Sequence, residues 1–208
     1  MKLRTLSLLA GLAVLGSAQA GPVVLYDNLT PGGYSSADGW VINSAQSLAQ
    51  MFTPSVGATL TQLQLSLSPT TGPFFEVQLV NSEAATTLFG LDEQPGTTVY
   101  ASWTNVQGQG LNLFNLSSPV SVVAGMNYWV VVRPTANQTG TAFWYQNANG
   151  INGTMAAAFG TTWSLGDDSS DGGGMKVIGE TGVPVPEPAT VALAGLALGL
   201  AARRRRNR

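Results

Sequence analysis

Short runs of β-branched, aromatic and other apolar residues, separated by turn-forming residues, fill the middle of the chain. Residues 63–67 alternate apolar with polar side chains, as a strand with one solvated face does. Residues 128–132 are apolar at every position, which predicts a central strand buried on both faces. No part of this region has the periodicity of a helix. The middle of the chain is therefore predicted to be all-β.

Several segments of this kind are expected to be strands, and turn residues such as Gly72-Pro73 and Asn149-Gly150 punctuate them. The expected strands are residues 23–26, 47–52, 60–67, 74–80, 97–103, 111–116, 128–133, 142–146, 155–159 and 175–178. Many short strands at this spacing predict a single β-sandwich or jelly-roll-like domain. We expect that domain to span residues 21–182, which is long enough for one core and too short for two.

The first 20 residues differ from this pattern. They begin with two basic residues, continue with an apolar run over 6–15 and end in Ala18-Gln19-Ala20. This order predicts a secretory signal peptide cleaved after Ala20, because small residues at Ala18 and Ala20 suit the signal peptidase. An N-terminal membrane anchor is the alternative, but an apolar run of about ten residues is too short to span a bilayer.

The last 26 residues, 183–208, have three adjacent parts: alternating prolines, an apolar stretch over 189–202, and four arginines. Alternating prolines favour an extended segment that a processing enzyme can bind. The stretch predicts a short hydrophobic helix of about 21 Å, less than the roughly 30 Å of a bilayer core, so we expect a transient inner-membrane anchor. Arginines resist translocation, which leaves the domain on the exported side. The stop signal comprises Arg203, Arg204, Arg205 and Arg206.

The motif Pro186-Glu187-Pro188, the apolar stretch and the arginine cluster together resemble a PEP-CTERM sorting domain, over about the last 26 residues. An ordinary single-span tail anchor is the alternative. The resemblance implies recognition by exosortase, a membrane-embedded cysteine-protease-like enzyme, and processing near the Pro-Glu-Pro motif. It further implies an exported protein of the cell surface or extracellular matrix in a Gram-negative bacterium that makes exopolysaccharide.

The middle of the chain has a looser resemblance to the choice-of-anchor β-sandwich domains. Its basis is the opening segment YDNL at 26–29, the segments 111–113 and 116–120, and AGMNYW at 124–129. These domains have no agreed activity, so the resemblance implies a β-sandwich fold and a surface location. It carries over no binding residue.

The charge of the middle excludes one class of partner. Residues 21–182 contain ten acidic residues and two basic ones, Arg133 and Lys176, which gives a formal charge of 2 − 10 = −8. Affinity for nucleic acid comes largely from clustered Lys and Arg, so we expect no nucleic-acid partner.

The chain contains no histidine and no cysteine. This excludes disulfides, thiolate zinc sites and the usual triads and dyads of hydrolases. Carboxylates remain, but nothing in the sequence pairs those of mid-domain across a cleft as a glycosidase requires. These are Glu76, Glu83, Asp92 and Glu93. We therefore expect that the protein is not an enzyme and has no resident cofactor.

One local motif has the spacing of a calcium loop. Asp167, Ser169 and Asp171 are oxygen-bearing residues at positions 1, 3 and 5, and Gly172 is at position 6. Position 12 is Ile178, where an EF-hand has a bidentate Glu, and no helices are expected beside the loop. We favour a solvated Gly-rich hairpin loop and keep calcium binding as the alternative.

The large aromatic residues allow two interpretations. They form either a sugar-stacking face or part of the core, and the sequence does not decide which side of a strand each ring takes. The candidates are Trp40, Trp103, Trp144, Tyr145 and Trp163. The sequence as a whole predicts a non-catalytic exported protein of the cell surface or exopolysaccharide matrix. A carbohydrate-binding, lectin-like module is the alternative.

Overall fold

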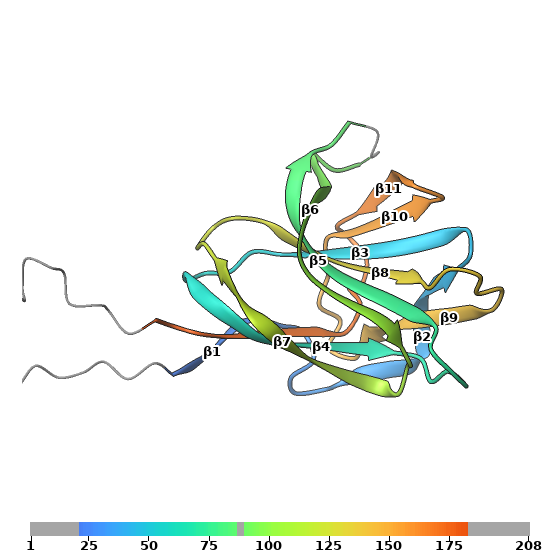
Figure 1. Ribbon diagram of the computed structural model, residues 1–208, viewed down its shortest axis with the longest axis horizontal. Helices are drawn as coiled ribbons and strands as arrows, with labels where there is room; N and C mark the ends of the chain where they lie inside the picture. Colours follow the sequence, from blue (N-terminus) through green and yellow to red (C-terminus); the bar gives the residue numbers. More distant parts are fainter. Residues whose placement is uncertain (1–20, 87–89, 183–208) are drawn as a thin grey trace, which may run out of the picture. The chain divides into compact units, whose positions relative to one another are not determined.

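All regular secondary structure of the domain is β-strand in the computed structural model, which describes residues 21–86 and 90–182 (Figure 1). The predicted signal peptide, hydrophobic helix and sorting tail lie outside the described residues. The strands are β1 (Pro22–Asp27), β2 (Tyr34–Asn43), β3 (Gln46–Phe52), β4 (Ala58–Leu67), β5 (Phe75–Ala84), β6 (Glu93–Val106), β7 (Gly110–Val122), β8 (Tyr128–Pro134), β9 (Thr141–Asn147), β10 (Met155–Phe159), β11 (Thr162–Asp167) and β12 (Met175–Glu180). The prediction of an all-β domain is confirmed. Within the described part, no helix is long and apolar enough to cross a bilayer.

The predicted strands all occur, and two further strands were missed. The first half of β2 contains Ser35, Ser36 and Asp38 and is followed by Gly39, so its local propensity for a strand is weak there. It forms because residues Gly39 to Asn43 pair with β9. Half of the β11 residues are exposed, and the strand pairs with β10 alone, across a register shift. Both segments become strands because of the strands with which they pair, and local sequence does not reveal those partners.

One connected sheet contains all the strands and folds back on itself. Its main path runs β1-β12-β4-β9-β2-β3-β8-β5-β6, with β7 on β4, β10 on β3, and β11 on β10. Two neighbouring pairs of strands along this path are joined by a single residue pair: β4 and β9 by Leu67 with Trp144, and β2 and β3 by Asn43 with Gln46. These two links divide the path into three groups, and in Figure 1 β1 and β4 of the first group lie in a layer apart from β3 and β8 of the third, which is consistent with a sandwich-like arrangement.

Apolar side chains from both layers fill the space between them. Leu65 of β4 and Val177 of β12 belong to the same buried cluster as Val130 of β8 and Val77 of β5. Burial of such side chains is the main favourable contribution to folding, at about 25 cal/mol per Å² of apolar surface. The predicted central strand is confirmed, because β8 lies between β3 and β5 and its residues 128–132 are buried.

The segment after β11 differs from the solvated hairpin loop that the sequence favoured. β11 pairs with β10 whereas β12 pairs with β1 and β4, so residues 168–174 connect the two layers and are not a hairpin turn. Its glycine part, 172–174, is buried. A Cβ at Gly173 would lie 2.5 Å from Nε1 of Trp144, and one at Gly172 would lie 3.1 Å from Oε1 of Gln50. These glycines therefore serve close packing.

Side-chain amides and an indole satisfy the peptide groups of this buried segment. Nδ2 of Asn28 donates to the carbonyl of Gly173 at 2.9 Å, and Nδ2 of Asn147 donates to that of Gly172 at 2.9 Å. Nε1 of Trp144 donates to the carbonyl of Gly174 at 3.2 Å. Buried peptide groups without partners would destabilise the fold, so these bonds allow the chain to pass through the interior.

We predict that Gly173→Ala lowers the free energy of unfolding by about 1 to 3 kcal/mol, because the new methyl group must displace the packed indole of Trp144. Denaturant titration of the variant and the wild type measures the difference. Gly72→Ala is the matched control, since a Cβ at Gly72 meets nothing within 4 Å. Equal losses of stability in the two variants would contradict the close packing of segment 172–174 against Trp144.

Candidate functional site

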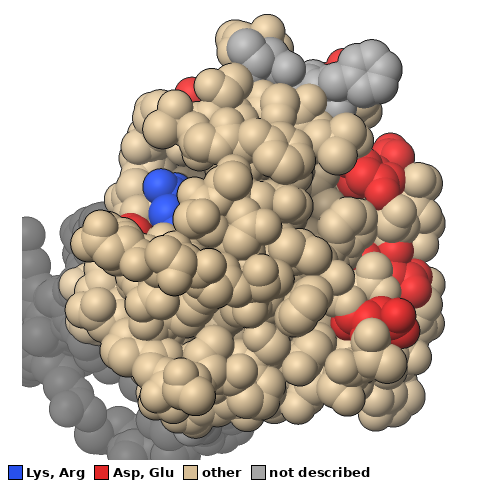
Figure 2. Space-filling view, turned by 90° about the vertical axis from the view of Figure 1, so that its right-hand side faces the viewer, with Lys and Arg blue, Asp and Glu red and all other residues tan. Residues whose placement is uncertain are grey.

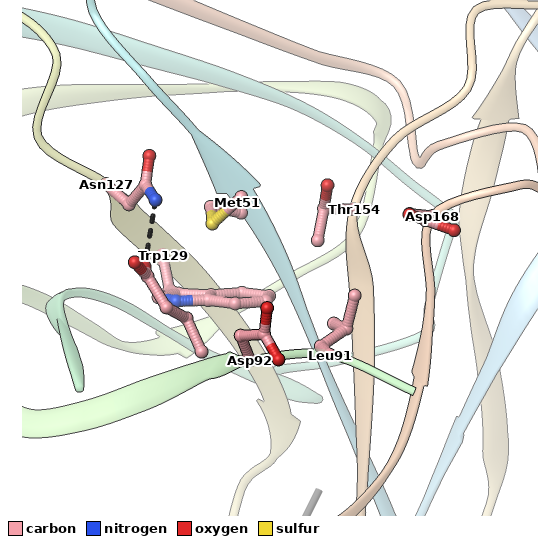
Figure 3. Close-up of a pocket in the computed structure, with 8 residues that line it drawn as sticks. Met51, Leu91, Asp92, Asn127, Trp129, Thr154 and Asp168 are labelled. Atoms are coloured by element: carbon pink, nitrogen blue, oxygen red, sulfur yellow. Dashed lines mark hydrogen bonds between the residues drawn. The ribbon is translucent and has the colours of Figure 1, made fainter. Parts of the chain in front are cut away.

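A pocket of the described domain has a lining that combines acidic, amide and hydroxyl side chains. Its volume is about 250 Å³ (Figure 3). The floor comes from paired strands, because Met51 of β3 lies directly opposite Trp129 of β8. The walls come from the ends of other strands and the adjoining loops. The wall residues are Leu91, Asp92, Glu93, Asn127, Thr154 and Asp168.

Small buried side chains lie on the same side of the sheet as this floor. Ala49 of β3 pairs with Val131 of β8 and with Ala156 of β10, and all three belong to a second buried cluster around Trp129. This cluster lies on the side of the sheet opposite the main core, since alternate residues of a strand face opposite sides. The second cluster thus supports the pocket from below.

A chain of hydrogen bonds fixes one wall of the pocket. Nε1 of Trp129 donates to Oγ of Ser82 at 3.0 Å, and the Ser82 hydroxyl donates to Oε2 of Glu93. Nδ2 of Asn127 donates to the same carboxylate oxygen at 2.8 Å, a bond drawn in Figure 3. The hydroxyl of Thr53 donates to Oδ1 of Asn127. Glu93 of β6 is therefore an acceptor shared by Ser82 of β5 and by Asn127, which directly precedes β8.

The lining of the pocket is acidic and rich in hydrogen-bond acceptors. Asp92, Glu93 and Asp168 contribute carboxylates, and no Lys or Arg lines the pocket. Acidic side chains also gather along one side of the face seen in Figure 2. A lining of this kind accepts hydrogen bonds from hydroxyl or amino groups and repels phosphate or sulfate.

The predicted calcium residues lie in the connection after β11. Oδ1 of Asp167 accepts hydrogen bonds from the backbone N–H of Ser169 at 2.8 Å and from its hydroxyl at 2.7 Å. Hydrogen bonds from the side chain of Ser170 and from Ser169 hold the pKa of Asp167 below its usual range. The carbonyl of Asp171 accepts from Nε1 of Trp40 at 2.9 Å. Protein donors thus occupy Oδ1 of Asp167 and the backbone carbonyl oxygen of Asp171.

No group of three or more Asp and Glu side chains in residues 21–86 and 90–182 lies close enough together to hold a metal ion. Calcium binding by Asp167, Ser169 and Asp171 stays a prediction.

The predicted aromatic residues do not share one face. Trp144 is fully buried in the main core, so it cannot stack on a ligand. Nε1 of Trp103 donates to the carbonyl of Asn115, and the ring of Tyr145 stacks on that of Tyr34. Trp163 packs against the second buried cluster. Of the two interpretations that the sequence left open, burial in the core holds for Trp144, and the five residues do not form a single sugar-stacking face.

The sequence predicted no pocket. It named Asp92 and Glu93 only as mid-domain carboxylates without a paired partner, and it assigned Trp129 only to a central strand. Glu76 and Glu83 lie outside the pocket, where they accept hydrogen bonds from Gln78 and Thr97. The alternation of Trp129 and Val130 could have indicated that β8 buries different clusters on its two faces, but not that a pocket lies above one of them.

The remaining predicted residues lie outside the described ones, and comparison with known proteins addresses them. Residues 184–206 match the PEP-CTERM protein-sorting motif. The chain carries a PEP-CTERM sorting signal. The match includes Pro186, Glu187, Pro188 and all four arginines, and it implies recognition by an exosortase-type enzyme. A PEP-CTERM signal at this end implies an exported protein. The signal-peptide residues Ala18 and Ala20 also lie outside the described residues.

Neither the curated proteins nor the solved structures include a match to this chain.

We predict that Glu93→Ala lowers the free energy of unfolding by about 1 to 3 kcal/mol, because Ser82 and Asn127 lose their shared acceptor. Chemical denaturation measures the loss. Asp92→Ala removes a neighbouring carboxylate that is exposed, and it should change stability by no more than about 0.5 kcal/mol. A Glu93→Ala variant as stable as Asp92→Ala would show that the network has no structural role.

Proposed function

We propose that this chain is a non-catalytic component of the cell surface or exopolysaccharide matrix of a Gram-negative bacterium. An exosortase-type enzyme processes it near Pro186-Glu187-Pro188, after the hydrophobic tail has held it transiently in the inner membrane. The observation that carries the proposal is the match of residues 184–206 to the PEP-CTERM protein-sorting motif. The part that is displayed is a β-sandwich domain.

The chemistry of the chain supports a non-catalytic role. Without histidine or cysteine, acid–base and nucleophilic chemistry depends on the carboxylates. Glu93 is the pocket carboxylate with the most extensive contacts, and its Oε2 already accepts hydrogen bonds from Ser82 and Asn127. A carboxylate engaged in this way between strands suits the role of a structural acceptor better than that of a general acid.

A carbohydrate-binding function is the alternative, and the pocket is the observation that favours it. Asp92, Asn127 and Thr154 bring a carboxylate, an amide and a hydroxyl to one concavity. Sugar hydroxyls form hydrogen bonds with groups of these kinds. The aromatic floor is covered, since Trp129 has no exposed surface, so binding would depend on the polar walls.

For sorting, we predict that wild-type protein extracted from the cell surface lacks the tail, whereas Glu187→Ala retains residues 203–206. The substitution removes the charged residue between the two prolines of the motif. Intact-mass analysis of the surface and membrane fractions distinguishes the two forms. Glu180→Ala, an exposed acidic residue before the tail, is the control and should be processed as wild type. A wild-type surface protein that still carries the arginines would contradict tail removal.

For the carbohydrate-binding alternative, we predict that Asp92→Ala weakens the affinity for any glycan that the wild type binds on an array by at least about tenfold. The reason is that loss of one charged hydrogen-bond partner costs about 1.5 to 3 kcal/mol. Glu83→Ala is the matched control, because Glu83 lies outside the pocket. Absence of glycan binding by the wild type, or equal loss in both variants, would exclude the pocket as a lectin site.

A further inference from the structure

β7 forms an open edge of the sheet. It pairs with β4 and with no other strand of the described domain. The pairing is regular from Gly110 to Asn115, opposite residues 62–67. The side chains of Leu111 and Leu113 are 49% and 56% exposed. A regular edge with exposed leucines is able to pair with a further strand.

The direction of the free backbone groups follows from the neighbouring strand. The backbone N–H of Ser66 donates to the carbonyl of Gly174, on the side of β4 away from β7. Backbone groups alternate in direction along a strand, so those of Leu65 face β7, where Leu65 is opposite Asn112. The N–H and C=O groups of Leu111 and Leu113 consequently point away from β4. They have no hydrogen-bond partner within the described residues.

The free edge is closed at both ends. The N–H of Gln109 donates to Oδ1 of Asn112 at 3.1 Å, which blocks the edge before Leu111. The carbonyl of Asn115 accepts from Nε1 of Trp103 at 3.2 Å, which blocks it after Leu113. What remains is a window of two residues with four unpaired backbone groups.

The window lies in an uncharged part of an acidic domain. No Asp, Glu, Lys or Arg occurs between Glu93 and Arg133, and β4 contains none either. Natural edge strands are commonly protected by a charged residue, and here exposed leucines stand in its place. Two copies of a domain with a formal charge of −8 can meet at this edge without placing like charges in contact.

We propose that β7 of a second copy of this chain pairs antiparallel with this window. Leu111 then lies opposite Leu113 of the second copy, and Leu113 opposite Leu111, about a two-fold axis at Asn112. The two residues of each copy exchange N–H···O bonds as hydrogen-bonded pairs, and the four leucines gather on one face. The match is self-complementary because the window is symmetric about Asn112. This self-association goes beyond the proposed function and depends only on the domain.

The experiment uses the full-length chain, purified in detergent that keeps the tails dispersed. The chain has no cysteine, so each introduced cysteine is unique. A tagged Leu111→Cys chain is mixed with a Leu113→Cys chain and oxidised. Directly opposed residues lie within disulfide range, whereas Leu111 of the two copies would be diagonal neighbours, so the mixed pair should exceed either homodimer on the order of tenfold.

Two further measurements complete the test. Val123→Cys and Met126→Cys are matched controls, because both residues are similarly exposed, at 60% and 57%, and lie outside the window. Leu113→Lys should weaken concentration-dependent association in sedimentation on the order of tenfold by placing like charges across the edge, whereas Met126→Lys should not. Equal yields of mixed and like pairs, equal cross-linking at the controls, or a monomer at all concentrations would overturn the proposal. Association that survives Leu113→Lys would assign it to another surface.

Discussion

The buried glycine segment 172–174 is the constraint on which the arrangement of the layers depends. It carries the chain from β11 to β12, and its carbonyls accept hydrogen bonds from Asn28, Asn147 and Trp144. Trp144 also forms the one ladder pair between β4 and β9, opposite Leu67. The close approach of backbone and indole therefore sets how β12 and β9 share the edge of β4. Side chains larger than hydrogen at these positions would separate the elements that this contact joins.

Two different faces of the sheet perform two different tasks. The inner faces bury the large apolar cluster that stabilises the domain. The outer face of β3 and β8 buries a smaller cluster around Trp129, above which the acidic pocket forms. The network from Trp129 through Ser82 to Glu93 links that cluster to the pocket wall. The position of the carboxylate thus depends on the packing of the indole beneath it.

The charge of the domain is unevenly distributed, so that some of its surfaces are acidic and the edge at β7 is uncharged. Acidic residues occur at the pocket and in the connection after β11, whereas the long segment between Glu93 and Arg133 has no charge. That segment includes β7, whose exposed Leu111 and Leu113 border the open edge. Repulsion keeps acidic surfaces apart in water, and an uncharged edge is free of that restraint. The signal for sorting the protein, in contrast, is the PEP-CTERM motif at 184–206.

The sequence by itself determined the all-β class, most of the strands and the sorting motif, because alternation, turn residues and an ordered tripartite tail are local patterns. It did not predict β2 and β11, whose residues have weak strand patterns and depend on partners distant in the chain. Nor did it show that the glycines at 172–174 are buried or that Trp144 lies in the core while Trp129 lies beneath a pocket. Only the tertiary structure decided these points, because the burial of a side chain depends on which strands pair and which faces meet.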